Sequence, residues 1–135
     1  MEPTRLFAII SLILLPTVMF GGYSLLGLMT RKPGLTPFQR TYFRAGHAHA
    51  GVLLVLSLIY YDYLARTTIA DGWQWLVCCV LVVGILAQSG GFFLHMVVGA
   101  LEQRSAGTML TIAGALLLAI AILFLAYALI TEYPA

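Results

Sequence analysis

The sequence predicts an all-α integral membrane protein with four transmembrane helices in an up-down antiparallel bundle. Of its 135 residues, 61% are hydrophobic and only 9% are charged, whereas an ordinary soluble domain is about 25% charged. A bilayer core about 30 Å thick requires about 20 apolar residues for each span. Four apolar runs meet this length, and they predict a single membrane domain, 1–135, with spans at about 6–29, 40–63, 73–99 and 106–130.

The first two spans are bounded by clear local patterns. The run after Arg5 is too long for the apolar region of a signal peptide, which has about 7–15 residues, so we expect a retained span. Pro16 lies in its middle and should kink it. The tetrapeptide Thr36-Pro37-Phe38-Gln39 offers an N-cap hydroxyl, a proline at the first helical position and a glutamine three residues after the cap. It therefore predicts that the second helix begins at Thr36, before its apolar part.

The distribution of basic residues predicts the topology. The connection between spans one and two, with the start of span two, carries Arg31, Lys32, Arg40 and Arg44, and the connection between spans three and four carries Arg104, against Arg5 and Arg66 on the other side. The positive-inside rule then places loops 30–39 and 101–105 in the cytoplasm and both termini outside, in a bacterial inner membrane. Short connections favour antiparallel neighbours.

The sequence lacks the patterns that are typical of several classes of function. The seven Lys and Arg residues are scattered, which argues against nucleic acid as a partner. No P-loop, GxGxxG, GxSxG or HExxH pattern occurs, so the sequence names no reaction and no catalytic residue. The adjacent Cys78 and Cys79 are expected to be small buried hydrophobic residues. Glycine pairs inside the spans, such as Gly21-Gly22 and Gly90-Gly91, predict close packing between helices.

Two polar stripes stand out at helical spacing. Each joins residues three or four positions apart, so each lies on one helix face. Ionisable groups within a membrane usually face an interior, a cavity or a partner, and we expect both stripes to point into the bundle. The stripe on span two contains Arg40, Arg44, His47 and Gly51, and the stripe on span three contains Gly84, Gln88, Gly91 and His95.

The three histidines are predicted to have different roles. His47 and His49 are two residues apart, so on a helix their rings project about 200° apart and cannot both bind one ion. We expect His47 to share a site with Gln88, and His49 either to bind a ligand or to hydrogen-bond across helices. His95 lies 20 residues after Trp75, or about 30 Å along a helix. This depth places it at the cytoplasmic edge, as an interfacial residue more than a ligand.

The run FRAGHAHAG, Phe43 to Gly51, resembles a segment of small uncharacterised bacterial four-span membrane proteins. Its His-x-His also resembles a helix of haem–copper-oxidase-like membrane proteins, in which opposed histidines serve different metal centres. By that resemblance His47 and His49 would be haem or metal ligands. The match covers only a few residues, and three histidines with four spans are too few for an oxidase, so oxygen reduction is not implied.

The leading expectation is a cofactor site in the cytoplasmic half. His47, His49, Arg44 and Gln88 would bind haem or a transition metal, with His47, His49 and His95 as the candidate metal ligands and Arg44 neutralising a propionate or another anion. A non-catalytic accessory or assembly subunit of a larger membrane complex is the first alternative, and a small ion or proton conduit is the second. The expected partners are the lipid bilayer and either further copies of the chain or a larger membrane protein.

Overall fold

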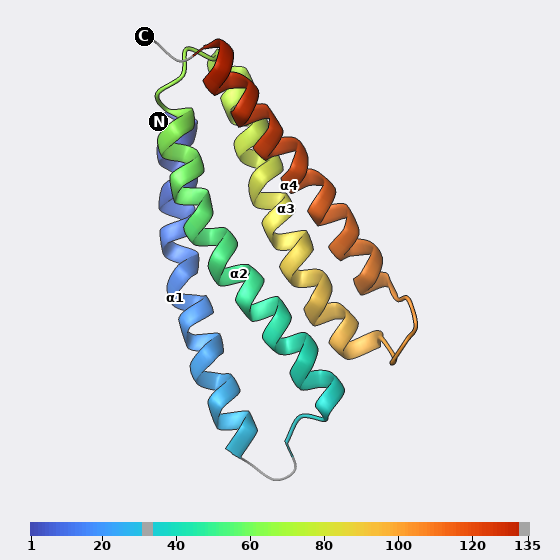
Figure 1. Cartoon of the computed structure of the whole chain (residues 1–135). Helices are drawn as coiled ribbons and strands as arrows, with labels where there is room; N and C mark the ends of the chain where they lie inside the picture. The colour runs from blue at the N-terminus through green and yellow to red at the C-terminus, as the bar shows by residue number, and fades with distance from the viewer. Residues whose placement is uncertain (31–33, 133–135) are drawn as a thin grey trace.

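The computed structural model describes residues 1–30 and 34–132, and in this part of the chain it is all-helical. Its four helices are α1 (Pro3–Thr30), α2 (Pro37–Leu64), α3 (Asp71–Val98) and α4 (Ala106–Thr131) (Figure 1). Each is long and apolar enough to cross a membrane. The predicted spans agree with these helices to within a few residues at each end, and α1 continues through Pro16. The basic and proline residues at 31–33, which were predicted to end the first span, lie outside the described residues.

Hydrogen bonds at the helix starts explain where α2 and α4 begin. The Thr36 hydroxyl accepts a hydrogen bond from the Gln39 amide at 3.2 Å, and the Gln39 side chain accepts one from the Thr36 amide at 3.0 Å. This capping box confirms the predicted start of α2. A second capping box, formed by Ser105 and Thr108, begins α4. The pattern Ser-x-x-Thr is present in the sequence at this position, and the start of the fourth span was predicted from apolar length alone.

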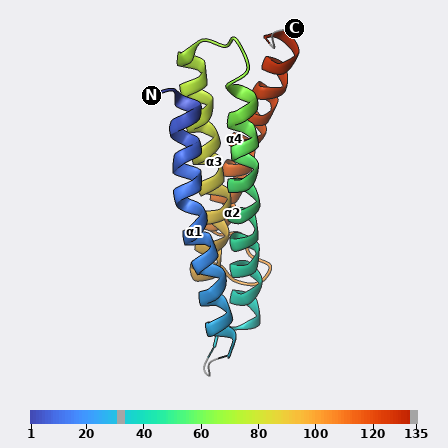
Figure 2. The same cartoon turned by 90° about the vertical axis from the view of Figure 1, so that its left-hand side faces the viewer.

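The first and last described residues lie at the same end of the molecule, which we call the terminal end (Figures 1 and 2). There the Phe7 ring of α1 lies 6.2 Å from Tyr61 of α2 and 5.8 Å from Trp75 of α3. The Thr68 amide donates a hydrogen bond to the Glu132 carbonyl after α4 at 3.0 Å. The opposite end, the loop end, carries residues 34–36 and 99–105, and both views show α1 and α2 extending beyond α3 and α4 there.

The buried core lies in the half nearer the terminal end. The Tyr60 hydroxyl donates a hydrogen bond to the Ala121 carbonyl of α4 at 3.0 Å, and the hydroxyls of Ser57 and Ser11 are 2.8 Å apart. Cys78 is fully buried whereas Cys79 is exposed, so the prediction of two buried cysteines is correct only for Cys78. The other buried apolar residues are Phe7, Leu54, Tyr61, Leu64, Val77, Leu81, Ile85, Leu118 and Ala128.

Glycines allow α3 and α4 to pack backbone to backbone. A Cβ atom on Gly91 would lie 2.5 Å from the Thr111 amide nitrogen and 2.7 Å from the Gly107 carbonyl oxygen. A Cβ atom on Gly114 would lie 2.7 Å from the Gln88 Cα. Neither atom could be accommodated without moving a helix, so the predicted role of small residues in packing is confirmed here. Gly90 differs, because nothing lies within 4 Å of the position its Cβ would take.

Candidate functional site

The two polar stripes do not face one another, contrary to expectation. The stripe of α2 faces α1: the Arg44 Nη2 lies 3.8 Å from the Met29 sulfur, and the His47 ring lies over the glycine pair of α1. The stripe of α3 faces α4, where the Gln88 backbone packs against Gly114. The structure therefore does not assemble Arg44, His47 and Gln88 into one site.

The physical reason is that helical spacing specifies which residues share a face but not which helix that face meets. The α2 stripe contains one glycine and the α3 stripe two, and each stripe packs against the helix that its glycines contact. A Cβ on Gly51 would lie 3.6 Å from a Val18 methyl of α1, and one on Gly84 would lie 3.1 Å from the Leu118 amide of α4. Each stripe therefore packs mainly against a helix that is adjacent in the sequence, α1 for the stripe of α2 and α4 for the stripe of α3.

His47 is packed against α1. A Cβ atom on Gly22 would lie 3.0 Å from its Nε2, and one on Gly21 would lie 3.5 Å from its Nδ1. The ring also stacks on Phe43, with centroids 6.4 Å apart and planes inclined by 29°. A planar cofactor cannot enter between this imidazole and the α1 backbone without separating the helices. The structure therefore places His47 beside α1 and does not show it beside Gln88, and a shared cofactor site of the two residues stays a prediction.

The His49 ring is oriented by a hydrogen bond within its own helix. Its Nδ1 lies 2.8 Å from the Ala45 carbonyl oxygen, one turn earlier in α2. Because a carbonyl can only accept, Nδ1 is the donor of this hydrogen bond, and a neutral ring in this tautomer has its lone pair on Nε2. Histidines that bind metals are usually oriented in this way, by a hydrogen bond from the other ring nitrogen. The Nε2 atom takes part in no hydrogen bond between the described residues.

An apolar hollow of about 190 Å³ lies beside this ring. Leu53, one of the residues around it, also borders a small internal cavity with Leu118 and Ile122 of α4. The Phe92 ring of α3 lies 4.8 Å from His49, and Gln88 precedes Phe92 by one helical turn. Of the two neighbouring histidines, His49 is thus the one on the Gln88 side of α2. The hollow is lined by Ala48, His49, Val52 and Leu53.

His95 belongs to a third environment, at the turn between α3 and α4. Its Nδ1 lies 2.7 Å from the Ser105 hydroxyl and 3.2 Å from the Thr108 hydroxyl. Its ring contacts Tyr42 and Phe38 of α2, with centroids 4.3 and 5.5 Å away. It is near the end of α3, as predicted, but only 4% exposed. The expectation of an interfacial side chain is corrected: the ring is enclosed by the protein and connects three helices.

The histidines therefore occupy three separate places. Within residues 1–30 and 34–132, no group of three or more His, Cys, Asp or Glu side chains is arranged to hold a metal ion. Sequence periodicity could not reveal the contacts of Phe92, Ser105 and Thr108 with these rings, because they depend on which helices become neighbours. The Ala45 contact was accessible in principle, since a residue four positions earlier is adjacent on any helix.

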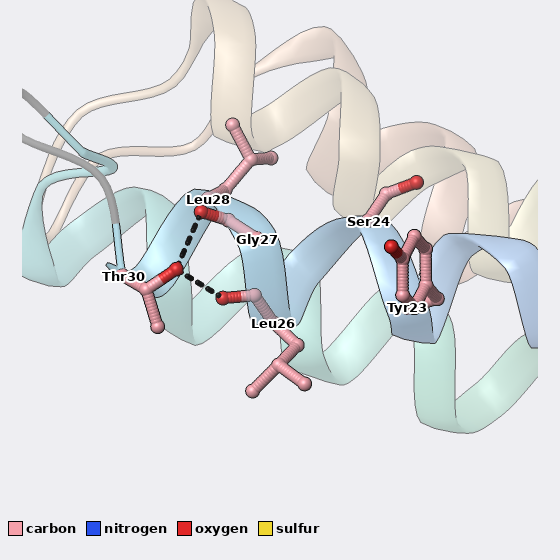
Figure 3. A pocket seen from close by; sticks show the side chains of 6 residues that line it. All are labelled: Tyr23, Ser24, Leu26, Gly27, Leu28 and Thr30. Carbon is pink, nitrogen blue, oxygen red and sulfur yellow. Dashed lines mark hydrogen bonds between the residues drawn. The ribbon is translucent and has the colours of Figure 1, made fainter.

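A hollow of about 620 Å³ lies near the loop end of α1 (Figure 3). All of its lining residues come from this one helix. The Thr30 hydroxyl is within hydrogen-bonding distance of the Leu26 and Gly27 carbonyls, at 3.2 and 3.0 Å. The surface offers no charged group to a ligand among Tyr23, Ser24, Leu26, Gly27, Leu28 and Thr30. The hollow beside His49 is likewise lined by one helix, α2, and differs in containing an imidazole.

Comparisons with known proteins found no matching family model, no similar curated protein and no similar solved structure. Function is accordingly inferred from the geometry around the histidines.

Proposed function

We propose that this chain is a membrane protein that holds a haem, or another transition-metal cofactor, on the Nε2 atom of His49. The observation that carries the proposal is the 2.8 Å hydrogen bond between His49 Nδ1 and the Ala45 carbonyl. It places a proton on Nδ1, and in the neutral ring Nε2 then has the lone pair that commonly binds haem iron and other transition metals. The hydrogen bond also limits rotation of the ring, so little ordering remains when a metal binds.

The surroundings of His49 suit the apolar rim of a porphyrin. The hollow is lined by aliphatic side chains, and the Phe92 ring packs on the imidazole. Its volume of about 190 Å³ is smaller than the roughly 300–1,000 Å³ of usual ligand pockets. A haem would therefore project from the hollow and complete its covering with lipid or another protein. Arg44 and His47 are not included in this site, because both face α1.

The cofactor content of single variants tests the proposal. Wild-type protein and His47→Ala, produced with ample haem and iron, should show a Soret band, and His49→Ala should lose at least nine-tenths of it. Pyridine haemochrome and metal analysis quantify the cofactor, and thermal unfolding in detergent checks that each variant is folded. Wild-type protein with neither haem nor metal, or equal content in His49→Ala, would refute a site at His49.

In the proposed orientation the four helices cross a bacterial inner membrane as an antiparallel up-down bundle, with loops 30–39 and 101–105 in the cytoplasm. The excess of basic residues near these loops supports it. Cysteines placed at Gly34 and Gln103, in a background without Cys78 and Cys79, should react with an impermeant maleimide only after the membrane is opened. If both positions react while the inner membrane is intact and the reagent reaches only its periplasmic side, the orientation is the reverse of the one proposed.

The small size of the hollow also favours a second function, that of an accessory subunit whose partner covers His49. Val52, at the edge of the hollow, is 67% exposed, so a neighbouring transmembrane helix could contact it directly. Colourless wild-type protein that elutes in a stable complex with another membrane protein, after solubilisation in mild detergent, would support this function. Pigmented protein that elutes alone would exclude it.

A further inference from the structure

We propose that Arg40 and Arg44 of α2 form a binding site for the phosphate group of an anionic phospholipid at the loop end of the molecule. The two residues are four positions apart in α2 and are therefore neighbours on one helix face. Their Cβ atoms are then about 5–6 Å apart, so both guanidinium groups can reach a single phosphate. The proposal rests on the membrane location put forward above and is independent of the cofactor at His49.

The charges of these two arginines are not offset by carboxylates. The one ion pair between described residues joins Arg66 to Asp62, near the terminal end. Four of the five acidic residues lie toward that end, and the fifth, Glu102, is exposed in the turn between α3 and α4. Within residues 1–30 and 34–132, the start of α2 thus carries two positive charges without a counterion from the chain.

The surroundings of Arg40 make its charge costly without an anion. The residue is partly buried, and its Nε atom is enclosed without a hydrogen-bond partner. An enclosed charged group is costly unless it is paired. Arg40 also lies in the first turn of α2, where the helix dipole disfavours a cation. The Nη atoms are not enclosed in this way, so they can donate hydrogen bonds to phosphate oxygens and offset the charge of the whole guanidinium.

The surroundings of Arg44 favour a lipid over free phosphate. Its side chain is exposed, and its Nη2 atom lies 3.8 Å from the Met29 sulfur of α1. Met29 is 38% exposed, and Leu26, about one turn earlier in α1, is 63% exposed. Apolar surface therefore begins directly beside the guanidinium group. A phospholipid matches both parts, because its phosphate would bind the arginines while an acyl chain would lie along Leu26 and Met29.

Thermal unfolding of the purified protein in a neutral detergent tests the proposal. Phosphatidylglycerol should raise the unfolding temperature in a saturable way, whereas inorganic phosphate at the same concentration should not. Arg40→Gln and Arg44→Gln should each require at least tenfold more of the lipid for half of this effect. Arg104→Gln is the matched control, because it removes an exposed cation from the same end of the molecule. It should differ from the wild type by less than twofold.

Each contrary result identifies the part of the proposal that is wrong. Inorganic phosphate or phosphatidylcholine that stabilises as strongly as phosphatidylglycerol would overturn an anionic lipid as the ligand. An equal loss in Arg104→Gln would overturn a site at Arg40 and Arg44 in favour of general charge attraction. Unfolding of each variant without lipid shows that it is folded. Colourless protein that responds to phosphatidylglycerol supports this site while it refutes the cofactor, and pigmented protein without a response refutes only this site.

Discussion

The pairs α3–α4 and α1–α2 have similar amounts of glycine at their contacts but pack in different ways. In α3–α4 each helix places glycines against the backbone of the other, as at Gly91 and Gly114. In α1–α2 the glycines of one helix face side chains of the other, as where Gly21 and Gly22 accommodate His47. The second pair also has a side-chain hydrogen bond between Ser11 and Ser57.

The difference shows what a small residue contributes in each place. Backbone atoms cannot move without shifting a whole helix, so a glycine that faces backbone has no tolerated replacement. A side chain can adopt another rotamer, so a glycine that faces one is replaceable at moderate cost. In a membrane, where lipid provides no hydrophobic drive for association, α3–α4 would combine backbone packing with the His95 hydrogen bonds, and α1–α2 would rely on side-chain contacts.

The largest expected effect is that of Gly91→Ala. The added Cβ would lie 2.5 Å from the Thr111 amide nitrogen, and overpacking of this kind costs about 1–3 kcal/mol. We expect a loss of stability near the upper limit, measured by equilibrium unfolding in mixed micelles. Gly90→Ala is the adjacent control, because its Cβ would meet nothing within 4 Å. It should be neutral or stabilise α3 by up to about 1 kcal/mol. Equal effects of the two variants would show that α3 and α4 do not pack as described.

A smaller effect is expected for His95→Ala, at the turn that joins α3 to α4. The substitution removes the partner of Ser105 and Thr108 and leaves a void beside Tyr42. Loss of a buried hydrogen bond with such a void should cost about 2 kcal/mol. Proteolysis of the 99–105 segment should accelerate together with thermal unfolding. His47→Ala is the control, because the His47 ring is only partly buried and packs against α1. A larger loss of stability in His47→Ala than in His95→Ala would contradict the assignment of His95 as the more important packing residue.

The smallest effect is expected for the hydroxyl pair of α1–α2. Hydrogen bonds between helices in membranes contribute about 0.6 kcal/mol on average. A double-mutant cycle of Ser11→Ala and Ser57→Ala should give a coupling energy of this size. Ser57 is also within hydrogen-bonding distance of the Leu54 carbonyl. The stability loss of Ser57→Ala alone therefore includes the energy of this second contact, which cancels in the double-mutant cycle. A coupling energy of zero would mean that packing alone joins the two helices.

The sequence was sufficient to predict the parts of the structure that depend on local chemistry. Apolar length predicted the four helices, and the spacing of Thr36 and Gln39 predicted the first residue of α2. The partners of each polar face could not be predicted, because they depend on how helices far apart in the chain are rotated about their axes. For this reason His47 was assigned the role that the geometry supports for His49, and the enclosed position of His95 was missed.

The projection of α1 and α2 past α3 and α4 at the loop end affects how the protein meets lipid headgroups (Figure 2). Arg44 lies in the second turn of α2 and is exposed, and Arg40 lies one turn nearer the end. In the proposed orientation the exposed Arg44 side chain would lie near the phosphate layer of the cytoplasmic leaflet, whereas Arg40 is partly buried. Attraction to anionic lipids contributes about 1 kcal/mol for each basic residue near the surface. In that orientation the longer hairpin would act as an electrostatic anchor that sets the depth of the shorter hairpin and of His49 in the bilayer.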